Sequence, residues 1–362
     1  MSARATAADV LAGTRRHAVI VGHALDGLRS LPDGCAQTCV TSPPYFGLRD
    51  YGVDGQIGQE ASPAEFVEAL VTVFREVRRV LADNGTLWLN LGDSYAANRT
   101  YQVPSTKGGA KHAPAQGNSG AMTVPEGLKA KDLMGIPWRV ALALQADGWW
   151  LRSDIIWSKP NPMPESVTDR PTRAHEYVFL LSKRERYFYD ANAIREDAVT
   201  GSSMIVGATS ERSSDRKSDV AVANGRNVQS VNAESERRDI AGCSFNNNPR
   251  LRITDGKRNA RSVWTIVGEP FDGAHFATMP PELARRCILA GSRRGDVVLD
   301  PFAGAGTTSL VAVGHGRRAI GCELNPEYAA LAVDRVAAVD TDATQPVRVE
   351  APQWGALFGE AS

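Results

Sequence analysis

A glycine-rich run, Asp300-Pro301-Phe302-Ala303-Gly304-Ala305-Gly306-Thr307-Thr308, lies toward the C-terminal end of the chain. It follows a short run of β-branched type, residues 296–300, and precedes residues 307–313, which are apolar at helical spacing. The chain is therefore predicted to turn from a strand into a helix at this run. Glycine allows backbone dihedrals closed to other residues and close approach of a ligand, so this context is typical of a nucleoside-binding loop in an α/β fold.

A second predicted strand, residues 317–322, follows the helix after the break Gly314-His315-Gly316. Glu323 ends this strand, where a carboxylate can accept hydrogen bonds from both hydroxyls of a ribose. Ser309 replaces the third glycine of a dinucleotide-binding G-x-G-x-x-G, and no Gly-Lys-Ser/Thr follows, so the phosphate-loop pattern fails. By itself the loop leaves open an NAD-type site, another nucleoside site and a plain tight turn.

The motif Ser42-Pro43-Pro44-Tyr45 directly follows the apolar stretch that ends at Thr41. It is predicted to cap a parallel strand at its carboxyl end, where open α/β sheets bind ligands. The two prolines stiffen the turn and remove two backbone donors. An exocyclic amine has two hydrogens, of which the Ser42 hydroxyl can accept one and the Pro43 carbonyl the other. Tyr45 can stack on a base drawn out of its helix. The alternative is a proline-rich turn with an incidental tyrosine.

Taken together, these motifs resemble those of S-adenosylmethionine-dependent DNA amino-methyltransferases of the β-type motif order, in which the catalytic loop precedes the cofactor loop. The resemblance covers roughly residues 17–96, 132–196 and 263–340. The stretches that carry it are residues 41–46, 155–162, 275–281, 302–306 and 323–328. It implies a Rossmann-like, doubly wound α/β methyltransferase sheet with a circularly permuted motif order and an inserted target-recognition region.

The resemblance also implies site residues and a cofactor, S-adenosyl-L-methionine. The catalytic residues are Ser42, Pro43, Pro44 and Tyr45. The cofactor-binding residues are Asp300, Phe302, Gly304, Gly306, Thr307, Glu323, Thr278 and His23. His23 departs from the family, which commonly has aspartate after Gly22, but a neutral histidine still offers a ring nitrogen to adenine.

The resemblance implies the domain organisation of the chain, and composition marks the segments inserted into it. Residues 17–196 form the predicted catalytic half of the methyltransferase domain, with a mobile basic loop at 97–131, and residues 263–340 form its cofactor-binding half. Residues 197–262 are polar and form the predicted target-recognition insertion, with a segment partly disordered without DNA as the alternative, and residues 341–362 form a tail. Within the catalytic half, residues 63–81 are predicted to form a core helix capped by Ser62, and residues 177–181 a buried strand. The neighbouring His175 and Glu176 are predicted to be structural.

The formal net charge is zero, yet basic residues are concentrated in residues 97–131 and 246–262. Such segments can track the phosphates of double-stranded DNA, and the alternative is a pair of solvated loops. The predicted DNA-binding residues are Lys159, Arg250, Arg252, Lys257 and Arg258.

The remaining composition fits a cytoplasmic enzyme. No apolar run approaches bilayer length, and the charged residues near the N-terminus leave no room for a signal-peptide core. The 5 cysteines are irregularly spaced, which argues against a disulfide framework and against a metal site. No Pro-Cys pair occurs, so covalent cysteine chemistry on a cytosine ring carbon has no evident nucleophile.

The predicted function is transfer of a methyl group to the N4 amine of cytosine in DNA. Within the resembling family, serine at the position of Ser42 mostly accompanies cytosine N4, whereas aspartate or asparagine mostly accompanies adenine N6. Adenine-N6 methylation therefore remains an alternative. Two alternatives from other classes are a nucleotide-dependent oxidoreductase and a catalytically silent nucleic-acid-binding relative. The sequence does not decide whether a cognate restriction endonuclease exists as a partner.

Overall fold

The structure is a computed structural model, which describes residues 5–48, 53–96, 99–100, 121–122, 124–125, 127–162, 164–197, 257–268 and 279–339. The chain divides into two compact units, Met1–Ile194 with Asn259–Ser362, and Arg195–Arg258. In the second unit the described residues form an antiparallel pair of short strands, β8 (Glu196–Asp197) and β9 (Lys257–Arg258). The remaining elements belong to the larger unit.

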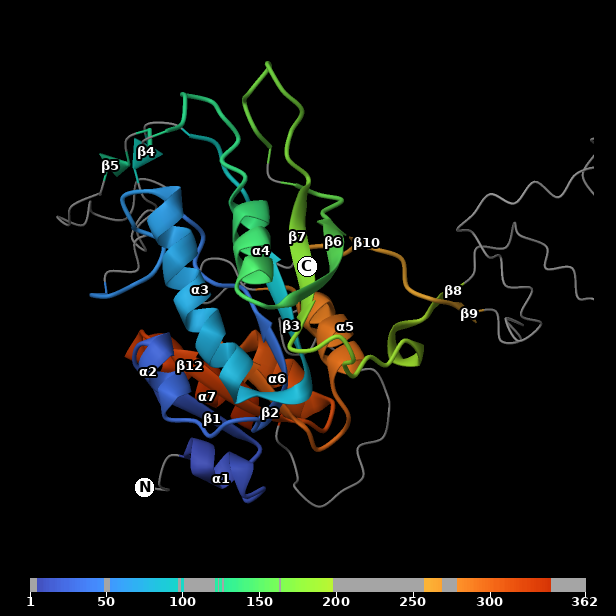
Figure 1. The fold of residues 1–362 in the computed structure, drawn as a ribbon. Coiled ribbons are helices and arrows are strands. Elements are labelled where there is room, and N and C mark those ends of the chain that lie inside the picture. Colours follow the sequence, from blue (N-terminus) through green and yellow to red (C-terminus); the bar gives the residue numbers. More distant parts are fainter. Residues whose placement is uncertain are drawn as a thin grey trace, which may run out of the picture. The chain divides into compact units, whose positions relative to one another are not determined.

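The larger unit is built on an eight-stranded sheet (Figure 1). Its strand order is β1 (His17–Val21), β12 (Arg318–Glu323), β11 (Val297–Asp300), β2 (Ala36–Thr41), β3 (Leu81–Leu91), β7 (His175–Ser182), β6 (Trp150–Ser158) and β10 (Val263–Thr265). The strand β7 pairs antiparallel with both β3 and β6, and the other described pairs in this sheet are parallel. The prediction of an α/β fold with a largely parallel sheet is thereby confirmed.

Helices cover both faces of the sheet because alternate strand residues are apolar on each face. On β3, Leu87 and Leu89 belong to one buried hydrophobic cluster and Trp88 to the other. The first cluster includes residues of α1 (Ala7–Leu11), α2 (Ala24–Arg29), α3 (Pro63–Val80) and α4 (Ile136–Ala146). The second includes residues of the 3-10 helix η2 (Asn192–Ile194), α5 (Pro281–Gly291) and α6 (Thr307–Gly314). The last helix, α7 (Pro326–Ala337), packs against β1, β12 and α6. A small separate ribbon joins β4 (Arg99–Thr100) and β5 (Ala121–Met122).

The helix α3 begins and ends close to the predicted positions. The Ser62 side chain accepts a hydrogen bond from the Glu65 backbone, and the Glu65 carboxylate accepts one from the Ser62 backbone, which makes a capping box. Phe66 and Phe74 are fully buried against the sheet. Leu81 has an extended conformation and already belongs to β3, so the helix ends one residue before the predicted Leu81.

None of the described helices combines the length and the apolar character that crossing a bilayer would require.

His17 gives the fold a specific pH dependence. It is buried at the start of β1, its Nε2 has no hydrogen-bond partner within the described part of the chain, and burial lowers its pKa from 6.5 to about 4. The unfolded chain therefore binds a proton at a higher pH than the folded chain does, and the stabilisation that is present above pH 6.5 is lost as the pH falls toward 4.

Between pH 7 and pH 5, urea unfolding should show that the wild type loses about 2 kcal/mol more stability than His17→Gln. Equal losses would mean that His17 accepts its proton in the folded state.

Candidate functional site

A cavity opens at the carboxyl edge of the sheet, beside β11 and β12. The space between its walls amounts to about 680 Å³ when the open solvent at its mouth is counted. Its walls come from the segments that follow β1, β2, β11 and β12, and from the first turn of α7. Five predicted site residues line it, namely His23, Pro44, Phe302, Gly304 and Glu323. Residues that the sequence did not predict as site residues also line it, among them Gln56, Ile57, Leu324, Asn325 and Tyr328.

Glu323, at the end of β12, has both carboxylate oxygens oriented by backbone donors. Its Oε2 accepts from the Gly304 N–H at 2.7 Å, and its Oε1 accepts from the Asn325 N–H at 2.8 Å. Burial raises the pKa of this carboxyl, and the two backbone hydrogen bonds oppose that effect. Each oxygen keeps a further lone pair. The arrangement can therefore accept hydrogen bonds from two adjacent hydroxyls of a ligand.

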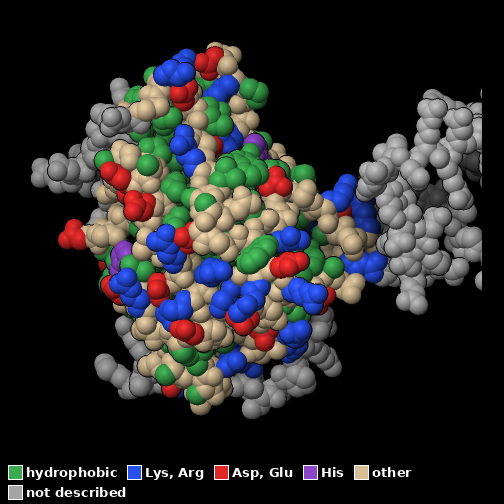
Figure 2. Space-filling model, viewed as in Figure 1, with side chains coloured by type: hydrophobic (Ala, Val, Ile, Leu, Met, Phe, Trp, Pro, Cys, Tyr) green, Lys and Arg blue, Asp and Glu red, His purple; other side chains and the backbone are tan. Residues whose placement is uncertain are grey.

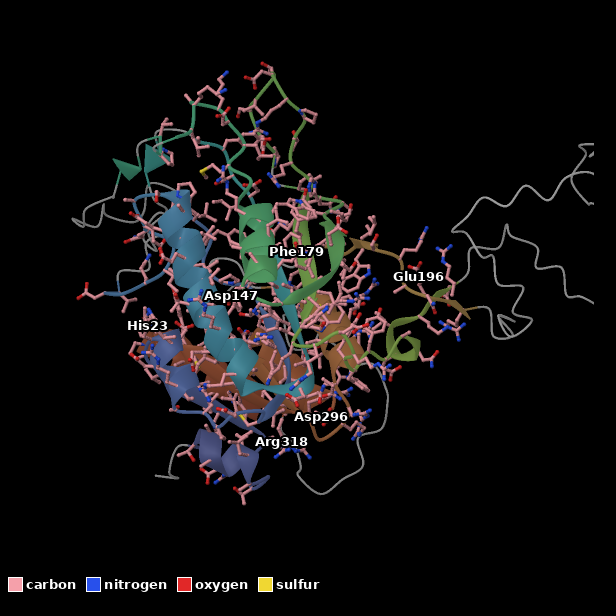
Figure 3. All side chains as sticks on the ribbon, in the orientation of Figure 1. His23, Asp147, Phe179, Glu196, Asp296 and Arg318 are labelled. Atoms are coloured by element: carbon pink, nitrogen blue, oxygen red, sulfur yellow. The ribbon has the colours of Figure 1, made fainter. Side chains whose placement is uncertain are left out.

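His23, labelled in Figure 3, caps the N-terminus of α2 and is one of the residues that line the cavity. Its Nδ1 accepts a hydrogen bond from the Leu25 N–H at 3.2 Å. In the neutral ring this leaves the proton on Nε2, which makes Nε2 a hydrogen-bond donor. The aspartate common in the resembling family would present an acceptor instead.

Three of the predicted cofactor contacts lie behind the cavity wall. Asp300 is buried, accepts hydrogen bonds from the Thr41 hydroxyl at 2.6 Å and from the Phe302 N–H at 3.1 Å, and has its pKa raised by burial. Gly306 has a left-handed φ of +77°, and a Cβ at this position would lie 2.7 Å from the Cβ of Ala332 in α7. Asp300 and Gly306 shape the glycine loop, and the third residue, Thr307, is buried at the start of α6. Their direct contact with a cofactor stays a prediction, and Thr278 lies outside the described residues.

The motif Ser42-Pro43-Pro44-Tyr45 directly follows the end of β2, as the sequence predicts. The strand β2 pairs with β11, so the motif and the glycine loop leave neighbouring strands at the same edge of the sheet. Pro44 lines the cavity, whereas Ser42, Pro43 and Tyr45 do not. The cavity thus ends at the loop that is predicted to hold the target amine.

Tyr45 belongs to a polar cluster with Glu176 and Lys159 that the sequence does not predict. Its hydroxyl donates to Glu176 Oε2 at 2.5 Å, and Lys159 forms an ion pair with the other oxygen of the same carboxylate. The Lys159 ammonium lies 4.3 Å from the ring centroid of Trp157. Glu176, predicted to be only structural, therefore contacts a predicted catalytic residue. Lys159, predicted to bind DNA, lies in the same cluster.

Two of the predicted DNA-binding residues, Lys257 and Arg258, are ion-paired. Lys257 pairs with Asp197 at 2.6 Å and Arg258 with Glu196 at 3.0 Å. Arg250 and Arg252 lie outside the described residues. On the face of the molecule drawn in Figure 2, Lys and Arg side chains are interspersed with Asp and Glu side chains.

The largely parallel sheet, with a cavity at its carboxyl edge, defines the class as an α/β protein. Residues 36–334 match the family model described as "DNA methylase". The chain belongs to this N6/N4 DNA methylase family.

Relatives support this assignment along most of the chain. The type II methyltransferase M.Cfr9I of Citrobacter freundii is 46% identical over 322 residues, which cover 89% of this chain and 88% of the relative. M.SmaI of Serratia marcescens is 45% identical over 319 residues, covering 88% of this chain and 90% of the relative.

Solved structures show the same fold. The Thermus thermophilus protein TTHA0409, solved in complex with S-adenosyl-L-methionine, has a TM-score of 0.51 and 26% identity, covering 90% of this chain and 95% of that chain. The PvuII DNA methyltransferase has a TM-score of 0.55 at 18% identity, covering 92% of this chain and 89% of that chain, and supports the fold alone.

Proposed function

We propose that this chain is a type II DNA methyltransferase that transfers a methyl group from S-adenosyl-L-methionine to the N4 amine of cytosine. Family membership makes it a DNA methyltransferase, which removes the oxidoreductase alternative. The observation that carries the finer proposal is the position of Ser42-Pro43-Pro44-Tyr45 directly after β2, beside a cavity that Pro44 helps to line. The type II relatives support a restriction-modification context, with double-stranded DNA as substrate and a cognate endonuclease as a partner.

The cavity has the groups that S-adenosyl-L-methionine requires. We assign the ribose hydroxyls to the spare lone pairs of Glu323, and the adenine to the surroundings of His23, which offers a donor to a ring nitrogen. Phe302, Gly304 and Pro44 line the same cavity. When bound, the cofactor supplies a methyl group on a positively charged sulfur, which is already a strong electrophile.

The protein's main task in this reaction is to orient the target amine. A cytosine amine is conjugated with its ring and is a poor nucleophile. The Ser42 hydroxyl and the Pro43 carbonyl accept its two hydrogens, which favours the pyramidal nitrogen required for attack and directs the lone pair at the methyl carbon. The nitrogen–carbon bond forms as the carbon–sulfur bond breaks, the electron pair stays on sulfur, and the nitrogen then releases a proton to solvent.

The choice of cytosine rests on the serine in this motif, and adenine N6 is the alternative within the same family. The test is expression of the protein in a host, followed by sequencing of the DNA with a method that distinguishes modified bases and by nucleoside analysis. We expect N4-methylcytosine at one short sequence. N6-methyladenine in its place would overturn the choice of base, and unmodified DNA would identify the chain as a catalytically silent relative.

We assign target recognition to the predicted insertion at residues 197–262, which nearly coincides with the separate unit Arg195–Arg258. Replacing Arg250, Arg252, Lys257 and Arg258 together with alanine should flatten the salt dependence of DNA binding. Each lost phosphate contact lowers the logarithmic slope by about one. The matched control is Arg285→Ala with Arg286→Ala, since these arginines also form ion pairs, with Glu282 on α5. Equal slopes for wild type and the fourfold variant would remove this segment from the DNA interface.

A further inference from the structure

The aromatic ring of Tyr45 is fixed at two points. At one end its hydroxyl donates to Glu176 Oε2 at 2.5 Å. Along one edge the ring lies directly on the backbone of Gly92, because a Cβ on Gly92 would be 2.5 Å from Tyr45 Cε2 and 3.1 Å from Cδ2. Both torsions of the tyrosine side chain are therefore defined before any base is present.

Glu176 is in turn held by its neighbours. The Asn90 side-chain amide donates to the same Oε2 at 3.1 Å and to the Tyr177 carbonyl at 3.1 Å. Lys159 forms an ion pair with Oε1, and the Glu176 side chain is only 14% exposed. Charge-assisted hydrogen bonds of this kind, shielded from water, are stronger and more directional than neutral ones. The carboxylate is therefore a rigid anchor for the tyrosine hydroxyl.

Because β7 runs antiparallel to its neighbours, Glu176 lies at the edge of the sheet where the parallel strands have their carboxyl ends. Glu176 is the second residue of β7, which runs antiparallel to β3 and β6. The amino end of an antiparallel strand lies at the edge where its parallel neighbours have their carboxyl ends. Glu176 consequently meets Tyr45, which follows β2, and Gly92, which follows β3.

We propose that Glu176 is a positioning residue that, together with Gly92, holds the ring of Tyr45 in the orientation required to stack on the flipped target base. The proposal rests on the proposed function, since it assumes that Tyr45 receives that base. A ring that is already ordered loses little side-chain freedom when the base binds, so the stacking energy is retained in the complex. Glu176 acts through Tyr45 and does not touch the base.

The first test is a double-mutant cycle of Tyr45→Phe and Glu176→Gln, with DNA that contains the recognition sequence. The readouts are the single-turnover rate of methyl transfer and the emission of a fluorescent base analogue at the target position. Each single change should lower the rate by about 10- to 100-fold, the range for loss of a hydrogen bond to a charged group. The double variant should be no slower than the slower single variant, because the hydrogen bond that Glu176→Gln weakens is already absent when Tyr45 lacks its hydroxyl.

The second test displaces the ring without changing any charge. Gly92→Ala should reduce base capture and methyl transfer when Tyr45 is present, and should have no further effect in a Tyr45→Ala background. The matched control for the carboxylate is Glu282→Gln, which removes an ion-paired carboxylate on α5 and should leave both readouts unchanged. S-adenosylhomocysteine affinity should stay at the wild-type value in Glu176→Gln, which separates positioning from a general loss of structure.

The outcomes are distinct. Additive effects in the cycle, or wild-type turnover and base capture in Glu176→Gln, would overturn the positioning role. An equal effect of Gly92→Ala with and without the Tyr45 ring would also overturn it, because the effect would then come from the backbone. Absence of methyl transfer by the wild type itself would refute the proposed function and not the contact.

Discussion

Ser42→Ala should nearly abolish methyl transfer to DNA while cofactor affinity stays unchanged. The substitution removes an acceptor that orients the amine, and this contact matters most in the transition state, when the nitrogen becomes pyramidal. Loss of one oriented hydrogen-bonding group in an active site lowers the rate by about 100- to 1000-fold. Ser42 follows Thr41 at the end of β2 and does not line the cavity to which we assign the cofactor. The measurements are single-turnover transfer of labelled methyl groups and calorimetric binding of S-adenosylhomocysteine.

The control for this prediction is Ser30→Ala, which removes a hydroxyl at the end of α2 that donates to the Gly27 carbonyl. It should transfer methyl groups at the wild-type rate. Full turnover of Ser42→Ala on the same DNA would show that the amine is oriented by other groups. A parallel loss of S-adenosylhomocysteine affinity would place Ser42 in the cofactor site instead.

Glu323→Ala should weaken S-adenosylhomocysteine binding by about 1.5 to 3 kcal/mol, or roughly 10- to 100-fold, because two ribose hydroxyls lose a charged acceptor. Glu327→Ala, four residues further along the same segment and exposed, is the matched control and should bind normally. The Gly304 and Asn325 N–H groups also lose their acceptor, so thermal unfolding must accompany the calorimetry. Unchanged affinity in a folded Glu323→Ala variant would remove this residue from the ribose site.

The affinity should also depend on pH. Burial raises the pKa of Glu323 above its usual range. A protonated carboxyl is a weaker hydrogen-bond acceptor for the ribose hydroxyls than a carboxylate is. Cofactor affinity should therefore be greatest above that pKa and should fall as the pH decreases through it. Glu323→Ala should lack this dependence.

The elements that follow from local patterns were predictable. The capping signal at Ser62 and the apolar spacing behind it locate α3 within one residue at its end. The β-branched run before the glycine loop locates β11. The predicted ribose-binding residue Glu323 ends β12 and lines the cavity. These features depend on neighbours in the sequence, and backbone propensity and periodicity report them directly.

The features that depend on distant residues were not predictable. Glu176 contacts Tyr45 only because β7 runs against its neighbours, and nothing within residues 175–182 indicates that direction. The hydrogen bond from the Leu25 N–H to Nδ1 decides which ring nitrogen of His23 carries the proton. The sequence alone therefore cannot say which of the two nitrogens is the donor and which the acceptor. The hydroxyl that donates to Asp300 belongs to Thr41, 259 positions away in the sequence, so no local pattern predicts this hydrogen bond.

The hydrogen bonds of Asp300 connect the loop that is predicted to hold the target base with the loop that lines the cavity. A single carboxylate oxygen accepts from Thr41, the residue before Ser42, and from the N–H of Phe302, which lines the cavity. A shift of either loop changes the bond that holds the other. We therefore expect cooperativity between cofactor and DNA, and linkage requires that each ligand change the affinity of the other by the same factor.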